Sequence, residues 1–440
     1  MNYKVAFISL GCAKNLVNTE QMMARVQDAG HTLLSSPEGA DVAVVNTCGF
    51  IDSAKEEAIG QILELGQQKA AGAVKKILVT GCLVQRYKEE ILKELPEVDG
   101  VLGTGSYAEI VRAVEEVMDE GKPSLFGNIH APADEYGRVL STPAWYAYLR
   151  IAEGCDNHCA YCVIPSLRGK YRSRPLDHVL AEARSLEKAG VKELIVVAQD
   201  ITRYGMDWDG KRHLPALLRE LCQMDFHWVR LHYLYPDEIT EELIETVASE
   251  PKILKYLDLP IQHCNDRVLT MMNRRGNKEY LRELFPRLRE RIPGLVLRTS
   301  LIAGLPGEDE AAFEELCDFL REVKIERAGV FPYSPEEGTP AAAMERVSAE
   351  ETARRTELLV DVQSGIMDEY NEAQLGKTVE VLCEGFDPQA QSYVGRSYAE
   401  SPDIDGRIYF TAENAPEVGT FVRVRLTGVM DGELTGERDD

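Results

Sequence analysis

Residues 146–165 read YAYLRIAEGCDNHCAYCVIP and join a strand-like run to a loop with three cysteines. The first eight residues, 146–153, are mostly apolar and aromatic, as expected of a strand buried in a sheet. Cys155, Cys159 and Cys162 follow with the spacing C-x3-C-x2-C. This spacing suits a tight loop that wraps a metal centre directly after a strand.

An iron–sulfur cluster is the metal centre that this loop favours. Structural zinc usually takes four protein ligands, typically from paired C-x2-C knuckles, and no second knuckle follows nearby. His158 lies next to Cys159, which is a poor position for a fourth ligand of the same site. Three thiolates without a fourth ligand suit a four-iron cluster with one open iron, free to bind a substrate or cofactor. A zinc knuckle and incidental thiols are the alternatives.

The run at 146–153 is the first of six strand-like runs in a central segment, residues 144–372. The other five are ELIVVAQD, WVRLHYL, YLDLPIQ, LVLRTSLIAGLP and RAGVFPYS. Helical stretches separate them, among them 178–188, 308–323 and 350–371. Six strand–helix units predict a partial (βα)6 barrel that stays open where an eight-stranded barrel closes. A flat doubly wound sheet is the alternative, because periodicity alone does not separate the two.

Two further segments flank this one and make the chain an α/β multidomain protein. Residues 1–120 alternate short β-branched runs (KVAFISL, DVAVVNT, KKILVTG) with helical stretches and predict a parallel α/β sheet domain. Residues 121–143 are rich in Gly, Pro and Ala without periodicity, so we expect a linker. Residues 373–440 carry short alternating runs broken by Gly, Pro and Asp, which predict a small antiparallel β-barrel.

Composition narrows the class of protein. The 440 residues include 49 Lys and Arg against 73 Asp and Glu, a net charge of −24, and such a chain does not present a general nucleic-acid surface. Its first residues lack a signal-peptide pattern, and no apolar run reaches the roughly 20 residues of a membrane span. We therefore expect a soluble, cytoplasmic protein without a membrane partner.

The remaining cysteines fall into two groups. In a cytosolic chain they favour metal ligation or redox chemistry over disulfides. Four stand alone in apolar or helical surroundings and are predicted to be buried small hydrophobes: Cys222, Cys264, Cys317 and Cys383. Cys12, Cys48 and Cys82 each end a strand-like run of the first segment. Because the carboxyl ends of parallel strands converge on one edge, these three predict a second three-cysteine site, with three unrelated buried cysteines as the alternative.

The motif of Cys155, Cys159, Tyr161 and Cys162 at the first loop of six βα units resembles the radical S-adenosylmethionine superfamily. The resemblance implies a 4Fe–4S cluster whose open iron binds the amino and carboxylate groups of S-adenosylmethionine, and electron transfer that cleaves it to a 5′-deoxyadenosyl radical. Tyr161 would then lie against the adenine. Further cofactor contacts are implied after the second and fifth strands: Gln199, Asp200, Gly304, Gly307 and Glu308. A rim aromatic and ordinary strand-to-helix turns are the alternatives.

Two three-cysteine sites and a small C-terminal β domain together resemble the methylthiotransferases, over essentially the whole chain. That resemblance implies two 4Fe–4S clusters that face each other across the first and second domains. The cluster held by Cys12, Cys48 and Cys82 would supply or carry the sulfur, and the other would generate the radical. A second S-adenosylmethionine would donate the methyl group, and a reductant such as flavodoxin or ferredoxin would supply electrons. No side chain is singled out as catalytic.

Several stretches resemble the branch that modifies an aspartate, at its β-carbon, in the twelfth protein of the small ribosomal subunit. They are SLGCAKN, AQDITRYG, LHYLYP and GRSYAESPDIDGRIYF. The last segment has one lysine and five arginines against thirteen acidic residues, which suits a basic ribosomal protein better than RNA. Nucleic acid is therefore not expected as the direct substrate. The alternatives are a methylthiotransferase for adenosine in transfer RNA, and a non-catalytic iron–sulfur or zinc protein that binds RNA or protein.

A cationic stretch, RGKYRSR at residues 168–174, follows the cysteine loop. Its four cations could contact RNA, the cofactor carboxylate or the surroundings of the target aspartate. A solvated loop that enters a helix at Pro175 is an equally good interpretation.

Overall fold

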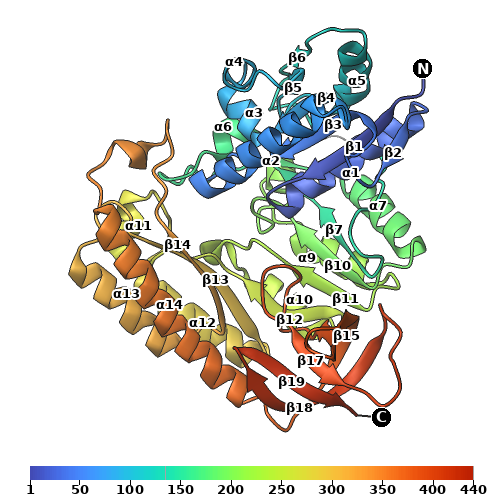
Figure 1. The fold of residues 1–440 in the computed structure, drawn as a ribbon. Coiled ribbons are helices and arrows are strands. Elements are labelled where there is room, and N and C mark those ends of the chain that lie inside the picture. The colour runs from blue at the N-terminus through green and yellow to red at the C-terminus, as the bar shows by residue number, and fades with distance from the viewer. Residues whose placement is uncertain (134, 440) are drawn as a thin grey trace.

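The computed structural model describes residues 1–133 and 135–439, which form three packed parts (Figure 1). The first part is a six-stranded parallel sheet in the order β2-β1-β3-β4-β5-β6. Its strands are β1 (Lys4–Ser9), β2 (Thr32–Leu34), β3 (Ala40–Thr47), β4 (Val74–Gly81), β5 (Gly100–Leu102) and β6 (Ser124–Leu125). The parallel α/β sheet expected at the N-terminus is confirmed.

Helices cover both faces of this first sheet. They are α1 (Ala13–Asp28), α2 (Asp52–Ala70), α3 (Cys82–Tyr87), α4 (Glu90–Glu94) and α5 (Ile110–Met118), with a 3-10 turn at Tyr107–Glu109. One apolar cluster packs α2 against the sheet, and another packs α1 and α5 against it. Strand β6 lies within residues 121–143, where the sequence predicts a linker, and it pairs parallel with β5. A two-residue strand is too short to give a periodic signal.

The central part is a second six-stranded parallel sheet, ordered β14-β13-β12-β11-β10-β7. Its strands are β7 (Tyr146–Arg150), β10 (Glu193–Val197), β11 (Trp228–Leu231), β12 (Ile253–Asp258), β13 (Val296–Ala303) and β14 (Arg327–Pro332). All six predicted strands are present. Their order follows the chain without the reversal of a doubly wound sheet, so the open, barrel-like arrangement is confirmed.

Long helices pack on one face of the central sheet around its main apolar core. They are α7 (Leu176–Lys188), α9 (Leu214–Cys222), α10 (Glu241–Ser249), α12 (Lys278–Arg291), α13 (Glu310–Val323) and α14 (Ala349–Glu372). Figure 1 shows α14 running alongside α13. Shorter pieces lie in the connections: β8 (Ala152–Glu153), α6 (Ile164–Arg168), β9 (Arg172–Ser173), α8 (Met206–Asp209), α11 (Asp266–Met271), and 3-10 turns at Pro236–Glu238 and Pro340–Ala343.

The C-terminal part is a closed five-stranded barrel in the order β15-β16-β17-β19-β18. Its strands are β15 (Thr378–Asp387), β16 (Ser392–Arg396), β17 (Ile408–Thr411), β18 (Phe421–Met430) and β19 (Glu433–Arg438). The predicted small barrel is confirmed, with two differences. Strand β19 was not predicted, because its sequence ELTGER is largely polar. It also closes the barrel by pairing parallel with β17, so the barrel is not wholly antiparallel.

Two segments from the flanking parts cover the face of the central sheet that lies opposite its helices. Helix α1 packs its Val17 against an apolar group that includes Tyr148 and Ile195. From the other side comes the loop between β16 and β17, residues 397–407, which we call the inserted loop. Within it, Ser401 Oγ lies 2.9 Å from His232 Nε2, and Asp405 accepts a 2.6 Å hydrogen bond from the Tyr256 hydroxyl. The three parts are thus joined through one shared face.

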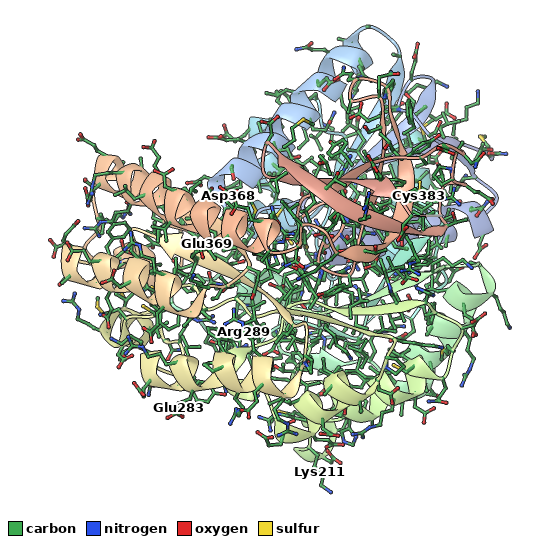
Figure 2. The ribbon with its side chains drawn as sticks, turned by 90° about the horizontal axis from the view of Figure 1, so that it is seen from below. Lys211, Glu283, Arg289, Asp368, Glu369 and Cys383 are labelled. Carbon is green, nitrogen blue, oxygen red and sulfur yellow. The ribbon has the colours of Figure 1, made fainter. Side chains whose placement is uncertain are left out.

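Burial of the lone cysteines agrees with their predicted role. All four are buried: Cys222, Cys264, Cys317 and Cys383. Figure 2 shows Cys383 within the C-terminal barrel, whereas Lys211 and Glu283 lie at the outer edge of the molecule. Across residues 1–133 and 135–439, no helix combines the length and apolar character that crossing a membrane requires.

Candidate iron–sulfur and cofactor site

The structure brings Cys12, Cys48 and Cys82 to one edge of the first sheet. Cys12 is the N-cap of α1 after β1, Cys48 follows β3, and Cys82 begins α3 directly after β4. Strands β1, β3 and β4 are adjacent and parallel, so their carboxyl ends lie side by side. We call these three residues the first trio.

Glycines let the three loops of the first trio approach each other closely. A Cβ atom added at Gly11 would lie 2.6 Å from the Cβ of Cys48, and one at Gly49 would lie 2.7 Å from the backbone nitrogen of Leu83. Gly81 has φ of +98° and would place a Cβ 2.5 Å from the Thr47 carbonyl oxygen. Only a residue without a side chain fits at these points.

Electrostatics couple the three thiols. Burial raises the pKa of Cys12, but the charges of Lys14 and Arg168, together with the backbone N–H groups of Asn15 and Lys14, outweigh burial and hold that pKa below its ordinary value. Burial, with the neighbouring Cys82 and Cys12, raises the pKa of Cys48 to about 12. A negative charge on one of these thiols makes ionisation of the next one harder. A bound metal cluster would neutralise the thiolate charges and so remove this repulsion.

Cys155, Cys159 and Cys162, the second trio, lie in the loop between β8 and α6. The backbone N–H groups of Asn157 and Ile164 each donate to a thiol at 3.5 Å, to Cys155 Sγ and Cys162 Sγ respectively. Burial raises the pKa of Cys155 to about 11. His158 is exposed, with a left-handed φ of +49°. Its position agrees with the view that it is not a ligand.

Each trio supplies three thiol donors from neighbouring loops. In a 4Fe–4S cluster with one open iron, three thiolates each bind a different iron. N–H groups that donate to the sulfurs are the contacts that tune such clusters. The donor chemistry of each trio therefore fits a cluster bound by three thiolates.

Arg168 connects the two trios. It ends α6, which begins two residues after Cys162, and it is 3% exposed. Its guanidinium donates to Asn15 Oδ1 and, at 2.9 Å, to Asn18 Oδ1, both in α1. It also lies 3.5 Å from Glu153 Oε2, and its positive charge acts to lower the pKa of the Cys82 thiol, which burial raises. Val163, which precedes α6, and Leu167 within α6 pack on Cys82 as well. The helix that follows the second trio thus lies directly on the first.

The interpretation of residues 168–174 as a solvated loop is wrong. Arg168 and Arg174 are both 3% exposed, and Arg174 forms a 2.6 Å ion pair with Glu182. Arg172 donates to the carbonyl oxygen of Arg168, and Lys170 alone among the four cations is exposed. The cause is strand β9, which pairs antiparallel with β8 and folds the stretch back into the domain.

Gln199 and Asp200 border the second trio. Gln199 Nε2 donates to Glu153 Oε1 at 2.9 Å, while Gln199 Oε1 is buried without a hydrogen-bond partner. Asp200 accepts from Asn157 Nδ2 and from the Thr202 backbone N–H, each at 3.0 Å. The unpaired Gln199 oxygen fits a cofactor amine, whereas Asp200 is already engaged within the loop.

Tyr161, Gly304, Gly307 and Glu308 are placed by contacts with the chain itself. The Tyr161 hydroxyl accepts from Arg274 Nη1 at 3.1 Å, and its ring packs against a small apolar cluster. The positive φ angles of Gly304 and Gly307 form the turn after β13. Burial raises the pKa of Glu308, but His263 and Arg355 outweigh it and lower that pKa. Glu308 is thus paired internally, as in the alternative of an ordinary turn.

Sequence reasoning missed three polar side chains at the site. Lys14 is 7% exposed, and its Nζ lies 3.5 Å from the centroid of the Tyr233 ring. The Tyr235 hydroxyl lies 3.8 Å from Cys159 Sγ, as does Arg274 Nη1 at 3.7 Å. Their only sequence signals are a lysine two residues after Cys12, the pair of tyrosines in LHYLYP, and an arginine in a cationic turn.

Comparison with known proteins identifies matches to all three parts of the chain. Family models match at residues 4–103 (Uncharacterized protein family UPF0004), 149–320 (Radical SAM superfamily) and 375–438 (TRAM domain). The chain is 48% identical over 439 residues to Ribosomal protein uS12 methylthiotransferase RimO of Symbiobacterium thermophilum, covering 99% of this chain and 90% of that protein. It is 48% identical over 441 residues to the protein of the same name from Pelotomaculum thermopropionicum, covering 99% of both.

Solved structures show likeness at the level of the fold. The radical S-adenosylmethionine methyltransferase TsrM from Kitasatospora setae, with cobalamin and a 4Fe–4S cluster bound, superposes with a TM-score of 0.59 at 14% identity. It covers 78% of this chain and 77% of that one. The cobalamin-dependent enzyme OxsB, with aqua-cobalamin and S-adenosylmethionine bound, gives a TM-score of 0.51 at 11% identity, covering 84% of this chain and 56% of that one.

Proposed function

The chain belongs to the family of ribosomal protein uS12 methylthiotransferases, and from that membership we propose how its own residues serve the reaction. It is a radical S-adenosylmethionine enzyme that methylthiolates uS12. We propose the β-carbon of an aspartate as the target. The observation that carries the cooperation of the two trios is the packing of Val163 and Leu167, which follow the second trio, with Cys82 of the first.

The second trio is proposed to hold a 4Fe–4S cluster with one iron left for S-adenosylmethionine, and the first trio to hold a second cluster. When bound, these groups supply hydrogen-atom abstraction from an unactivated C–H bond and the sulfur that replaces the hydrogen, chemistry beyond the reach of side chains. The unpaired Gln199 oxygen would accept from the amine of S-adenosylmethionine. Val163 and Leu167, which pack on Cys82, would keep water away from the space between the trios.

Three roles follow for the proposed domains at residues 1–120, 144–372 and 373–440. The first would carry sulfur, the second would activate S-adenosylmethionine, and the third would bind the ribosomal protein. The excess of acidic residues in the third supports docking of a basic protein. A flavodoxin or ferredoxin would supply electrons in the cytoplasm, where ribosomes assemble.

Iron content and product mass test the proposal together. Protein reconstituted without oxygen should bind about eight irons, four per cluster. With reductant and S-adenosylmethionine it should add a methylthio group to uS12. A variant with Cys12, Cys48 and Cys82 all changed to Ala should retain about four irons and form no carbon–sulfur bond on uS12.

Transfer RNA offered in place of uS12 is the matched control for substrate. Methylthio-adenosine with unmodified uS12 would show that the aspartate assignment is wrong. Iron binding without cleavage of S-adenosylmethionine would favour a non-catalytic iron–sulfur protein.

A further inference from the structure

The two outermost strands of the central sheet, β7 and β14, differ in what their outer edges bond (Figure 1). All five residues of β7 are buried, and side chains of the chain itself bond its outer carbonyl oxygens. Those of Tyr146, Tyr148 and Arg150 accept from Thr142 Oγ1, Arg138 Nη1 and Arg174 Nη1 at 2.7, 2.7 and 2.6 Å, respectively. The edge at β7 is therefore closed to any further strand.

Strand β14 leaves the backbone groups of its outer edge unpaired. Tyr333, directly after the strand, donates its N–H to the Ala303 carbonyl oxygen of β13 at 2.8 Å. Because successive residues direct their backbone groups to opposite sides of a strand, those of Ala328, Val330 and Pro332 point away from β13. In the described residues, 1–133 and 135–439, β14 pairs with β13 alone, and no other hydrogen bond reaches these three backbones.

The residues of β14 also suit pairing with one more strand. Residues 328–330 are only half-buried, and Phe331 is 43% exposed. The Phe331 ring lies over Gly329, where an added Cβ would come 3.0 Å from Phe331 Cε2. An exposed aromatic side chain on a strand makes favourable contacts across to a neighbouring strand. Pro332 has no N–H to donate, so it confines pairing to the residues before it.

The open edge of β14 runs from the C-terminal barrel to the first trio. At its start, Arg327 bonds Glu400 of the inserted loop at 2.8 Å. Just after its end, Ser334 Oγ accepts from the backbone N–H of Asp52 at 3.3 Å, four residues after Cys48. A strand of this length spans about 20 Å. A segment paired with β14 therefore reaches from the domain proposed to dock uS12 to a proposed cluster site.

We propose that β14 binds the segment of uS12 that carries the target residue, as a seventh strand of the central sheet. This inference rests on the proposed function. Backbone pairing holds an extended segment in place, and alternate side chains of that segment point to one face of the sheet. Nucleic acid cannot supply such a strand. Beyond the end of β14, the exposed side chains of Asp52 and Glu337 are acidic, which suits a basic protein.

The test is residue-resolved hydrogen exchange of β14 in the iron-loaded, unreduced enzyme, with and without saturating uS12. Exchange at Ala328 and Val330 should slow by about tenfold or more, because both N–H groups gain a partner. Gly329 and Phe331 are the internal control. Their N–H groups point to β13 and should exchange at nearly the same rate in both states.

Ala328→Pro tests the same pairing through affinity. It removes one outer donor and leaves the bonds to β13 intact. The variant should keep its iron and bind uS12 about three- to tenfold more weakly, as expected for one backbone hydrogen bond. Ala328→Ser keeps the N–H and is the matched control, which should bind uS12 as the unmutated enzyme does.

Several outcomes would overturn the inference. Unchanged exchange at Ala328 and Val330 with uS12 bound does so whether or not the variants fold, and so does equal slowing along the whole strand, which indicates burial without pairing. Slowing that depends on enzyme concentration without uS12 assigns the edge to a second copy of the chain instead. Equal affinity of the iron-loaded Ala328→Pro and Ala328→Ser variants also contradicts it.

The same measurements separate this inference from the proposed function. Methylthiolation of uS12 without alternating protection of β14 overturns the inference and leaves the proposed function standing. Methylthiolation of transfer RNA alone, without binding of uS12, removes both.

Discussion

At the scale of single residues, the first trio depends on the neighbouring glycines, which have no Cβ atom, as much as on its thiols. The loops carrying Cys12, Cys48 and Cys82 approach so closely that glycine stands beside each cysteine. At Gly81 two constraints coincide, a left-handed φ and a Cβ position that meets the Thr47 carbonyl. Packing of backbone on backbone therefore sets the positions of these thiols.

Gly81→Ala should move Cys82 and weaken the first cluster site. Gly72→Ala is the matched control, because Gly72 also has a positive φ, of +80°, but an added Cβ there meets nothing within 4 Å. Both changes incur the left-handed penalty, and only Gly81→Ala adds a clash, so we expect it to be about 1–3 kcal/mol more destabilising. Urea unfolding and iron content measure this. Equal losses for the two variants would contradict the packing argument.

Residue-level prediction from sequence grouped the six cysteines into the two trios proposed as cluster ligands, but it did not find the side chains that contact them. The six cysteines were found because thiols at strand ends or in C-x3-C-x2-C spacing are rare patterns. Arg168 was seen only as one of four cations in a loop, and Lys14 was not considered. Whether a cation is buried depends on which distant segments meet it. Asn15 and Asn18, which bind Arg168, lie some 150 positions away in the chain.

At the scale of elements, the inserted loop and β11 meet around a buried histidine. His232 follows β11 and pairs with Ser401 of the inserted loop. Burial and the cations Arg230, Arg298 and Lys14 lower the pKa of His232 well below its ordinary value. The imidazole therefore stays neutral in the folded protein at pH values where a free histidine is charged.

His232 should make the protein less stable in mild acid. The unfolded chain takes up a proton at this histidine near pH 6.5 and the folded chain does not, so stability is lost as pH falls below that value. Between pH 7.5 and 5.5 the loss should be about 1.4 kcal/mol, and His232→Gln should abolish it. Urea unfolding followed by tryptophan fluorescence measures it, since all three tryptophans lie within residues 144–372.

Ser401→Ala is the matched control for His232→Gln. It removes the hydrogen bond to the ring but keeps the buried imidazole among its cations. Its stability should be lower at every pH, with the same slope as the parent protein. A His232→Gln curve parallel to that of the parent would show that another group titrates.

Element prediction succeeded where apolar character recurs and failed where it does not. Six central strands and the barrel strands β15 to β18 were found from alternation or from continuous apolar runs. Strands β2, β5, β6 and β9 were missed because each has only two or three residues, and β19 was missed because it reads ELTGER. Strand β19 exists because closure of the barrel gives its backbone partners on both sides. A polar segment that becomes a strand only through such tertiary pairing has no alternating apolar pattern from which the strand could be predicted.

At the scale of the whole molecule, one carboxylate fastens the first sheet to the far end of the central one. Glu336, in the loop after β14, is 1% exposed and accepts from Lys55 Nζ of α2 at 3.0 Å and from Arg86 Nη1 of α3. Helix α3 begins with Cys82. The position of the first trio over the central sheet therefore depends on a contact beyond its sixth strand.

Glu336→Gln should loosen this attachment. It leaves Arg86 without a carboxylate partner at a buried contact, while Lys55 keeps Asp52, and we expect this to destabilise the fold by about 3 kcal/mol. Hydrogen exchange of residues 82–87 should speed up, and methylthiolation of uS12 should slow. The adjacent Glu337→Gln serves as the control, because the Glu337 side chain is exposed and only its carbonyl contacts Arg86. Identical exchange rates in both variants would falsify the fastening role.

The inserted loop also constrains how such a protein can be recombined. A C-terminal barrel borrowed from another source would arrive without Glu400, Ser401 and Asp405, leaving Arg327, His232 and Tyr256 of the recipient unmatched. Barrel and central sheet must therefore be inherited together as one unit of exchange. A chimera spliced at the boundary near residue 373 needs this loop grafted from the host as well as the junction.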